Sequence, residues 1–175
     1  MKDIRFKLVS QLMKNSRQSD RDLAKVMGVS QPTVTRVRNK LETERYFSEY
    51  TAIPNFKKLG YHLLAITFVS LKETLKIEQV QEAIKGLPTI VNKARENFPN
   101  IIMIERGVGL GSTAVVISYH KDYSSYSKLL DATKRNPLLN LKTQNFLINL
   151  DDELRYQPLT MSTLARDIGT SSEES

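Results

Sequence analysis

The stretch Ser19–Arg38, SDRDLAKVMGVSQPTVTRVR, predicts two short helices joined by a tight turn. Ser19 is a good N-cap, and two acidic residues follow it in the positive first turn of the first helix. Gly28 can adopt the left-handed conformation that ends a helix. Ser30 can cap the next helix, which tolerates Pro32 in its first turn. This arrangement is typical of a helix-turn-helix, whose second helix enters the major groove of DNA.

The second predicted helix has one apolar face and one polar face. Val34, Val37 and Leu41 recur at intervals of three and four residues, so we expect this stripe to face the core. Arg36 and Asn39 lie on the opposite side. Arginine pairs with guanine and asparagine with adenine, each through two hydrogen bonds, so this face carries chemistry that reads base edges. An ordinary amphipathic helix with a solvated charged face is the simpler interpretation of the same pattern.

We expect the DNA-binding residues to gather on and beside this helix. Arg36 and Asn39 are expected to read bases, and Arg38, Lys40 and Arg45 to neutralise phosphates. Polar residues near the cap could reach bases or phosphates. The full predicted set is Ser30, Gln31, Thr33, Thr35, Arg36, Arg38, Asn39, Lys40 and Arg45.

Charge is distributed unevenly along the 175 residues. Residues 1–60 hold thirteen Lys or Arg against six Asp or Glu, a net of +7, whereas residues 151–175 hold two against six, a net of −4. A basic excess around the helix-turn-helix suits a surface that displaces counterions from phosphates. The acidic C-terminal segment could compete with DNA for that surface or aid solubility.

The residue types exclude several kinds of site. The chain contains no cysteine, which excludes structural disulfides, cysteine-ligated zinc and thiol nucleophiles. His62 and His120 are the only histidines and lie far apart, so we expect no metal, no cofactor and no enzymatic triad. The longest strongly apolar run, Leu63–Val69, is too short to span a bilayer, and the N-terminus lacks a signal-peptide core. We therefore expect a soluble, cytoplasmic protein that does not bind a membrane.

Residues 1–53 are predicted to form a winged helix-turn-helix DNA-binding domain. A first helix over about Asp3–Lys14 packs on the helix-turn-helix pair, and Tyr46–Ile53 is a plausible strand pair or wing. A linker over residues 54–60 follows, and residues 151–175 form a C-terminal tail.

Residues 61–150 are predicted to form a ferredoxin-like domain, which makes the chain α+β. The expected order is strand, helix, strand, strand, helix, strand (βαββαβ) in one antiparallel sheet. The strands are Tyr61–Leu71, Ile101–Arg106, Ser112–Tyr119 and about Leu141–Leu150, and the second helix is Asp122–Asn136. The first helix follows the periodicity of Ile77, Val80, Ile84 and Leu87, and Pro88 is expected to break or restart it before Phe98.

The predicted strands are apolar on both faces. In the first strand Leu63, Ala65 and Val69 alternate with Leu64, Ile66 and Phe68, and the third strand repeats the pattern. Helices cover only one face of such a sheet, and a solvated second face is normally polar. We expect a second subunit to cover it, so that the protein forms a dimer with its sheets face to face. The alternative is that the tail, with a short helix at Ser162–Ile168, folds back on its own sheet.

With both halves in view, the chain resembles the Lrp/AsnC (leucine-responsive, feast/famine) transcription regulators over about residues 3–150. The resemblance is carried by Leu23-Ala24, Met27-Gly28-Val29-Ser30, Thr33-Val34, Arg36-Val37 and Leu41-Glu42, then by Tyr50-Thr51-Ala52 and Leu59-Gly60-Tyr61. Arg45 departs from the pattern, because the family has glycine after the second helix. A left-handed arginine costs about 1 kcal/mol, so either the helix continues or Arg45 is kept as a phosphate contact.

The resemblance implies a regulator that binds double-stranded DNA and that dimerises or assembles further through the ferredoxin-like domain. Many members of the family bind an amino acid as effector, so the resemblance also implies a possible amino-acid effector here. The run Gly107-Val108-Gly109-Leu110-Gly111 is predicted to be a hairpin turn rather than a nucleotide cradle. With Ser112, the glycines Gly107, Gly109 and Gly111 could border an effector pocket. Two alternatives remain open, a siroheme-decarboxylase-like enzyme of the same architecture and a low-specificity, chromatin-like DNA binder.

Overall fold

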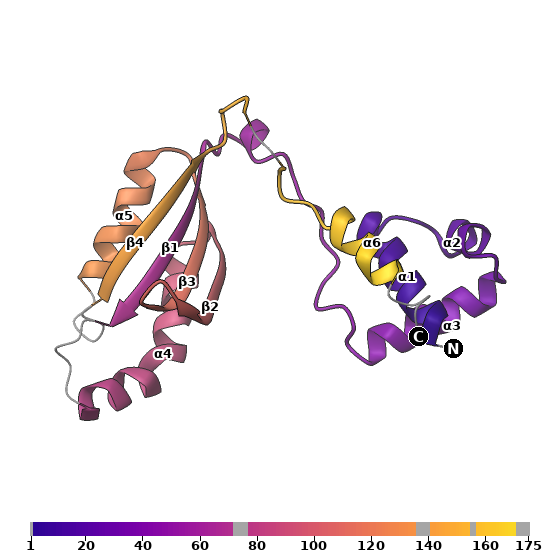
Figure 1. Ribbon diagram of the computed structural model, residues 1–175, viewed down its shortest axis with the longest axis horizontal. Helices are drawn as coiled ribbons and strands as arrows, with labels where there is room; N and C mark the ends of the chain where they lie inside the picture. Colours follow the sequence, from indigo (N-terminus) through magenta and orange to yellow (C-terminus); the bar gives the residue numbers. More distant parts are fainter. Residues whose placement is uncertain (1, 72–76, 136–140, 155–156, 171–175) are drawn as a thin grey trace. The chain divides into compact units, whose positions relative to one another are not determined.

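The computed structural model describes residues 2–71, 77–135, 141–154 and 157–170. The chain divides into two compact units, one of residues 1–54 together with the segment that starts at residue 155, and the other of residues 55–154 (Figure 1). Each unit has its own secondary structure and is described by itself.

The first unit is helical and contains the predicted helix-turn-helix. Its helices are α1 (Lys2–Lys14), α2 (Asp20–Met27), α3 (Gln31–Thr43) and α6 (Ser162–Thr170). The prediction for the first helix is confirmed to within a residue. The small core is almost purely aliphatic and consists of Leu8, Leu12, Leu23, Ala24, Val34 and Leu41.

The expected wing is absent as a strand pair, because Tyr46–Ile53 contains no strand. Phe47 packs against the helical core, and its ring stacks on Tyr50 with centroids 5.2 Å apart. The Tyr50 hydroxyl donates a hydrogen bond of 2.9 Å to Oε1 of Glu42 on α3. These side-chain contacts hold the segment along the helices, where a two-stranded ribbon would need its own cross-strand pairing.

The C-terminal helix α6 packs on α1, not on the sheet (Figure 1). Ala165 is fully buried, and Oγ of Ser10 on α1 donates a buried hydrogen bond of 2.5 Å to its carbonyl oxygen. A Cβ placed on Gly169 would lie 3.0 Å from the same Oγ, so the small residues allow a close helix–helix approach. The alternative in which the tail covers its own sheet is therefore wrong for α6.

The second unit is a four-stranded antiparallel sheet with the predicted βαββαβ order. Its elements are β1 (Leu63–Leu71), α4 (Ile77–Asn97), β2 (Ile101–Gly109), β3 (Ser112–His120), α5 (Tyr123–Lys134) and β4 (Leu141–Asn149). The strand order β2-β3-β1-β4 confirms the ferredoxin-like topology. None of the described helices combines the length and the apolarity needed to cross a membrane.

Two local features of this unit differ from expectation. Helix α4 continues through Pro88, which was expected to interrupt it. Pro88 is exposed, so water can satisfy the carbonyl group that loses its helical partner there. The segment before the sheet also contains a short 3₁₀ helix, η1 (Lys57–Leu59), which ends at Gly60 with φ = 79°.

The glycine-rich run forms the predicted hairpin turn between β2 and β3. Gly109 pairs with Ser112, and the two residues between them are left-handed, Leu110 with φ = 52° and Gly111 with φ = 65°. Two left-handed residues in a two-residue loop define a type I′ turn. One of the two positive-φ positions is therefore occupied by leucine, not by glycine.

The two faces of the sheet differ in cover. Helix α5 packs on one face, where the Tyr126 ring lies 5.2 Å from that of the buried His120. The register places the alternate residues on a second face, where the described side chains, apart from the buried Tyr119, are only partly buried or exposed. We call this second face the open sheet face; its apolar residues are Leu64, Ile66, Phe68, Val115, Ile117, Phe146 and Ile148.

Candidate DNA interface

The turn between α2 and α3 has the predicted caps. The side chain of Ser19 accepts a hydrogen bond of 3.2 Å from the backbone N–H of Asp22, and Gly28 is left-handed with φ = 68°. Oγ of Ser30 accepts from the backbone N–H of Thr33 at 3.4 Å and starts α3. The two hydroxyl groups of Ser30 and Thr33 lie 2.8 Å apart, so both are used within the cap.

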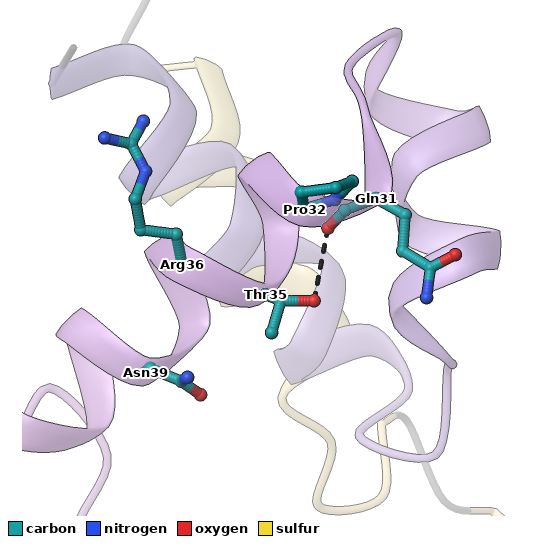
Figure 2. Close-up of a pocket in the computed structure, with 5 residues that line it drawn as sticks. All are labelled: Gln31, Pro32, Thr35, Arg36 and Asn39. Carbon is teal, nitrogen blue, oxygen red and sulfur yellow. Dashed lines mark hydrogen bonds between the residues drawn. The ribbon is translucent and has the colours of Figure 1, made fainter.

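The face of α3 that points away from the core forms a shallow groove. Val34 and Leu41 are fully buried, which fixes the rotation of the helix. The groove has a volume of about 670 Å³ and is lined by Gln31, Pro32, Thr35, Arg36 and Asn39 (Figure 2). The structure thus brings together four of the predicted DNA-binding residues and adds Pro32.

Arg36 and Asn39 are both exposed on this face. Figure 2 shows the Arg36 side chain extending away from the helix into open space. Among the ion pairs of the described residues, none includes Arg36. Its guanidinium group is therefore available to a base or a phosphate without first breaking an internal contact.

Arg38 has a different environment. Its Nε atom lies 2.8 Å from Oδ1 of Asp20, and its terminal NH2 nitrogen donates to the Gln18 carbonyl oxygen at 3.1 Å. These contacts join the start of α2 to the middle of α3. The structure therefore does not place Arg38 with the groove residues, and the expected phosphate contact competes with this internal role.

Asp20 is a residue whose role in the site was missed. Its Oδ2 atom accepts a hydrogen bond of 2.6 Å from the Thr35 hydroxyl, while Oδ1 faces Arg38. From the sequence, Asp20 is expected only to stabilise the first turn of a helix through its negative charge. Its partners lie 15 and 18 residues away, so no local pattern reveals the cluster.

Lys40 and Arg45 lie at the C-terminal end of α3. Nζ of Lys40 is 3.6 Å from Oε1 of Glu44, an exposed pair of small energetic weight. Arg45 has φ = 56°, and the Tyr46 amide behind it donates to the Leu41 carbonyl oxygen at 2.9 Å. This is the helix-ending motif that normally uses glycine, so the helix stops here and the option of a continued helix is wrong.

The residues proposed for an effector lie in the other unit. Gly107, Gly109 and Gly111 belong to the β2–β3 hairpin, and Ser112 is buried at the start of β3. The backbone accounts for two of the three glycines, Gly109 with φ = 156° and Gly111 with φ = 65°, whereas Gly107 has no positive φ.

The fold and the exposed α3 face define a helix-turn-helix protein of the DNA-binding class. Residues 1–46 match the family model described as "Winged helix-turn-helix DNA-binding". The chain is 34% identical over 109 residues to an uncharacterized HTH-type transcriptional regulator, PF2053, of Pyrococcus furiosus, with 62% of this chain and 66% of that protein aligned. It is also 34% identical over 86 residues to the HTH-type transcriptional regulator LrpA of Pyrococcus abyssi, covering 49% of this chain and 60% of LrpA.

Solved structures share the fold over most of the chain. An AsnC family transcriptional regulator from Agrobacterium tumefaciens superposes with a TM-score of 0.68 at 16% identity, covering 94% of this chain and 99% of that one. The regulator NMB0573 of Neisseria meningitidis, solved as an L-Met complex, superposes with a TM-score of 0.69 at 15% identity, covering 92% and 97%. The chain is thus similar in sequence to LrpA and shares its fold with the solved AsnC-type regulators.

Proposed function

We propose that this protein is a sequence-specific DNA-binding transcription regulator that acts as a dimer or larger assembly. The observation that carries the proposal is the groove on α3, where Arg36 and Asn39 are exposed beside Gln31. These side chains match the hydrogen-bonding patterns of guanine and adenine in the major groove. Arg36 and Asn39 read bases, and Gln31 reaches a base or phosphate near the start of the helix.

Phosphate contacts supply the part of the affinity that does not depend on sequence. Lys40 and Arg45 are exposed at the end of α3, and residues 1–60 carry a net charge of +7. Each phosphate neutralised by such a side chain releases counterions, so binding weakens as salt rises. Arg38 is left out of this set because it already holds Asp20.

The open sheet face supports the proposed dimer. It presents a cluster of apolar side chains that a solvated antiparallel sheet would not carry, and Phe146 within it is 61% exposed. A second copy that covers this face would bring two helix-turn-helix units onto one duplex. Two recognition helices related by a two-fold axis fit half-sites about one helical turn apart, so the operator is roughly palindromic.

The direct test is selection of random duplexes by the full chain, followed by titration of the selected duplex. Arg36→Ala is expected to weaken binding to that duplex by roughly 1–3 kcal/mol and to relax specificity at one position in each half-site. Lys93→Ala, which removes an exposed positive charge from α4, is the matched control and is expected to leave affinity unchanged. Equal binding to the selected and a scrambled duplex would instead support the chromatin-like alternative.

We also propose that an amino acid modulates this binding. The support is the neighbouring fold solved with L-Met, together with the exposed glycine hairpin at residues 107–111. Repeating the duplex selection with and without a panel of amino acids tests the idea. An unchanged affinity across the panel would contradict it without affecting the DNA-binding proposal.

A further inference from the structure

The Thr35 hydroxyl group is engaged before any DNA arrives. Its Oγ1 atom donates to Oδ2 of Asp20 at 2.6 Å, and the Gln31 carbonyl oxygen lies 3.2 Å away as a second acceptor (Figure 2). A hydroxyl group has a single proton to donate. Thr35 therefore has no proton left for the N7, O6 or O4 acceptors that base edges present in the major groove.

Asp20 is itself held in place and neutralised. Arg38 lies 2.8 Å from its other carboxylate oxygen, and the Asp20 and Arg38 side chains are only 21% and 19% exposed. Asp20 thus acts as a positioning residue that turns the Thr35 hydroxyl inward. Its negative charge is paired within the domain, so it does not face the phosphates alone.

With its hydroxyl group turned inward, Thr35 presents its methyl group to the groove. In Figure 2 the methyl carbon points away from the hydrogen bond to Gln31. The Pro32 ring lines the same groove one helical turn earlier and has no side-chain polar atom. Pro32 and Thr35 therefore form an apolar strip between Gln31 on one side and Arg36 and Asn39 on the other.

We propose that this strip recognises the 5-methyl group of a thymine in each operator half-site. The thymine methyl is the one apolar group among the base edges of the major groove, and threonine methyl groups are suited to contact it. The inference rests on the proposed function and adds a base identity that the hydrogen-bonding residues do not supply. The half-site then has a thymine next to the bases read by Arg36 and Asn39.

The test uses the duplex selected by the full chain, with each thymine replaced in turn by deoxyuridine, which differs only by loss of the methyl group. At one position in each half-site, we expect this change to weaken binding about fourfold, which corresponds to about 0.8 kcal/mol for one buried methyl group. Replacement at the other thymines is expected to have no effect.

Two substitutions of Thr35 separate its methyl group from its hydroxyl group. Thr35→Ser keeps the hydroxyl group and the bond to Asp20 but lacks the methyl, so it is expected to bind the thymine and deoxyuridine duplexes equally. Thr35→Val keeps a methyl group in place and is expected to retain the discrimination. Circular dichroism melting of both variants checks that each is folded.

Three outcomes overturn the inference. The first is that the wild-type protein binds every deoxyuridine duplex as tightly as the parent duplex. The second is that Thr35→Ser still discriminates between the thymine and deoxyuridine duplexes as strongly as the wild type. In both cases binding to the selected duplex leaves the proposed function intact. Failure of the selection to yield any preferred sequence overturns both proposals together.

Discussion

Arg45 carries two opposing effects at a single residue. Its left-handed backbone, with φ = 56°, costs about 1 kcal/mol relative to glycine. Its exposed guanidinium group lies at the end of the proposed reading helix. Glycine at this position would avoid the cost, and the exposed arginine is suited to the proposed phosphate contact.

Arg45→Gly is therefore expected to raise the free energy of unfolding by about 1 kcal/mol and to weaken DNA binding. The slope of log affinity against log salt concentration should fall by about one, the contribution of one phosphate contact. Chemical denaturation and salt-dependent titration measure the two effects. Arg45→Ala is the control, because it loses the charge but keeps the backbone strain; a gain in stability from it would contradict the explanation.

Asp20 provides a second prediction at this scale. Asp20→Asn removes the charge that pairs with Arg38, which leaves a largely buried guanidinium group without its carboxylate. We expect the free energy of unfolding to fall by about 1–2 kcal/mol, between the values for exposed and buried pairs. Asp22→Asn removes an acidic residue from the same first turn and controls for the helix-dipole effect. Equal effects of the two variants would show that the Arg38 contact contributes nothing.

His120 makes the stability of the sheet unit depend on pH. Burial lowers the pKa of His120 below its usual value of 6.5, against smaller opposing effects of a backbone contact to Ser125 and the charge of Asp122. Its Nε2 and Nδ1 atoms lie 2.8 Å from Oγ of Ser118 and 3.1 Å from Nδ2 of Asn100.

The unfolded chain therefore takes up a proton at a pH where the folded chain does not. Stability is fully present above pH 6.5 and falls as the pH drops below this value toward the lower pKa of the folded state. Denaturation at pH 7.5 and pH 5.5 is expected to show this loss in the wild type and in His62→Gln, but a smaller loss in His120→Gln. An unchanged loss in His120→Gln would show that another group titrates.

At the scale of elements, the close packing of α6 on α1 depends on a glycine. A Cβ at Gly169 would meet Oγ of Ser10 at 3.0 Å, so Gly169→Leu is expected to destabilise the helical unit by about 1–3 kcal/mol. Leucine favours the helical conformation more than glycine does, so helix propensity alone would make Gly169→Leu stabilising. A loss of stability would therefore point to the close packing. Amide exchange in α1 measures the effect, and Thr163→Leu, at an exposed position of α6, is the control. Unchanged exchange in Gly169→Leu would contradict the proposed close packing.

Elements whose signals are local were predictable from the sequence. Ser19, Gly28 and Ser30 set the limits of α2 and α3, and apolar spacing placed the buried side of α3 correctly. The strand pair expected over Tyr46–Ile53 was wrong because Phe47 and Tyr50 resemble strand residues but have their partners on the helices. The Asp20 cluster and the Ser10–Ala165 contact depend on residues distant in sequence, so no periodicity could reveal them.

At the scale of the whole molecule, the open sheet face predicts the state of assembly. Phe146→Asp places a charge in its apolar surface and is expected to shift the proposed dimer to a monomer of 20.0 kDa in sedimentation at micromolar concentration. Leu164→Asp, at an exposed apolar residue on α6, is the control and should leave the assembly unchanged. A wild-type protein that sediments only as a monomer would rule out the sheet-to-sheet dimer.

Because α6 packs on α1, the position at which the gene is cut decides whether the helical unit is complete. The sheet is inserted between α3 and α6, so the helical unit is encoded in two separate pieces. A fragment that ends at Pro54 omits the helix that buries Ser10, and a reporter fusion built on it would carry an incomplete module. Chimaeras that exchange specificity between relatives therefore need to transplant the codons from residue 155 onward together with those of residues 1–54.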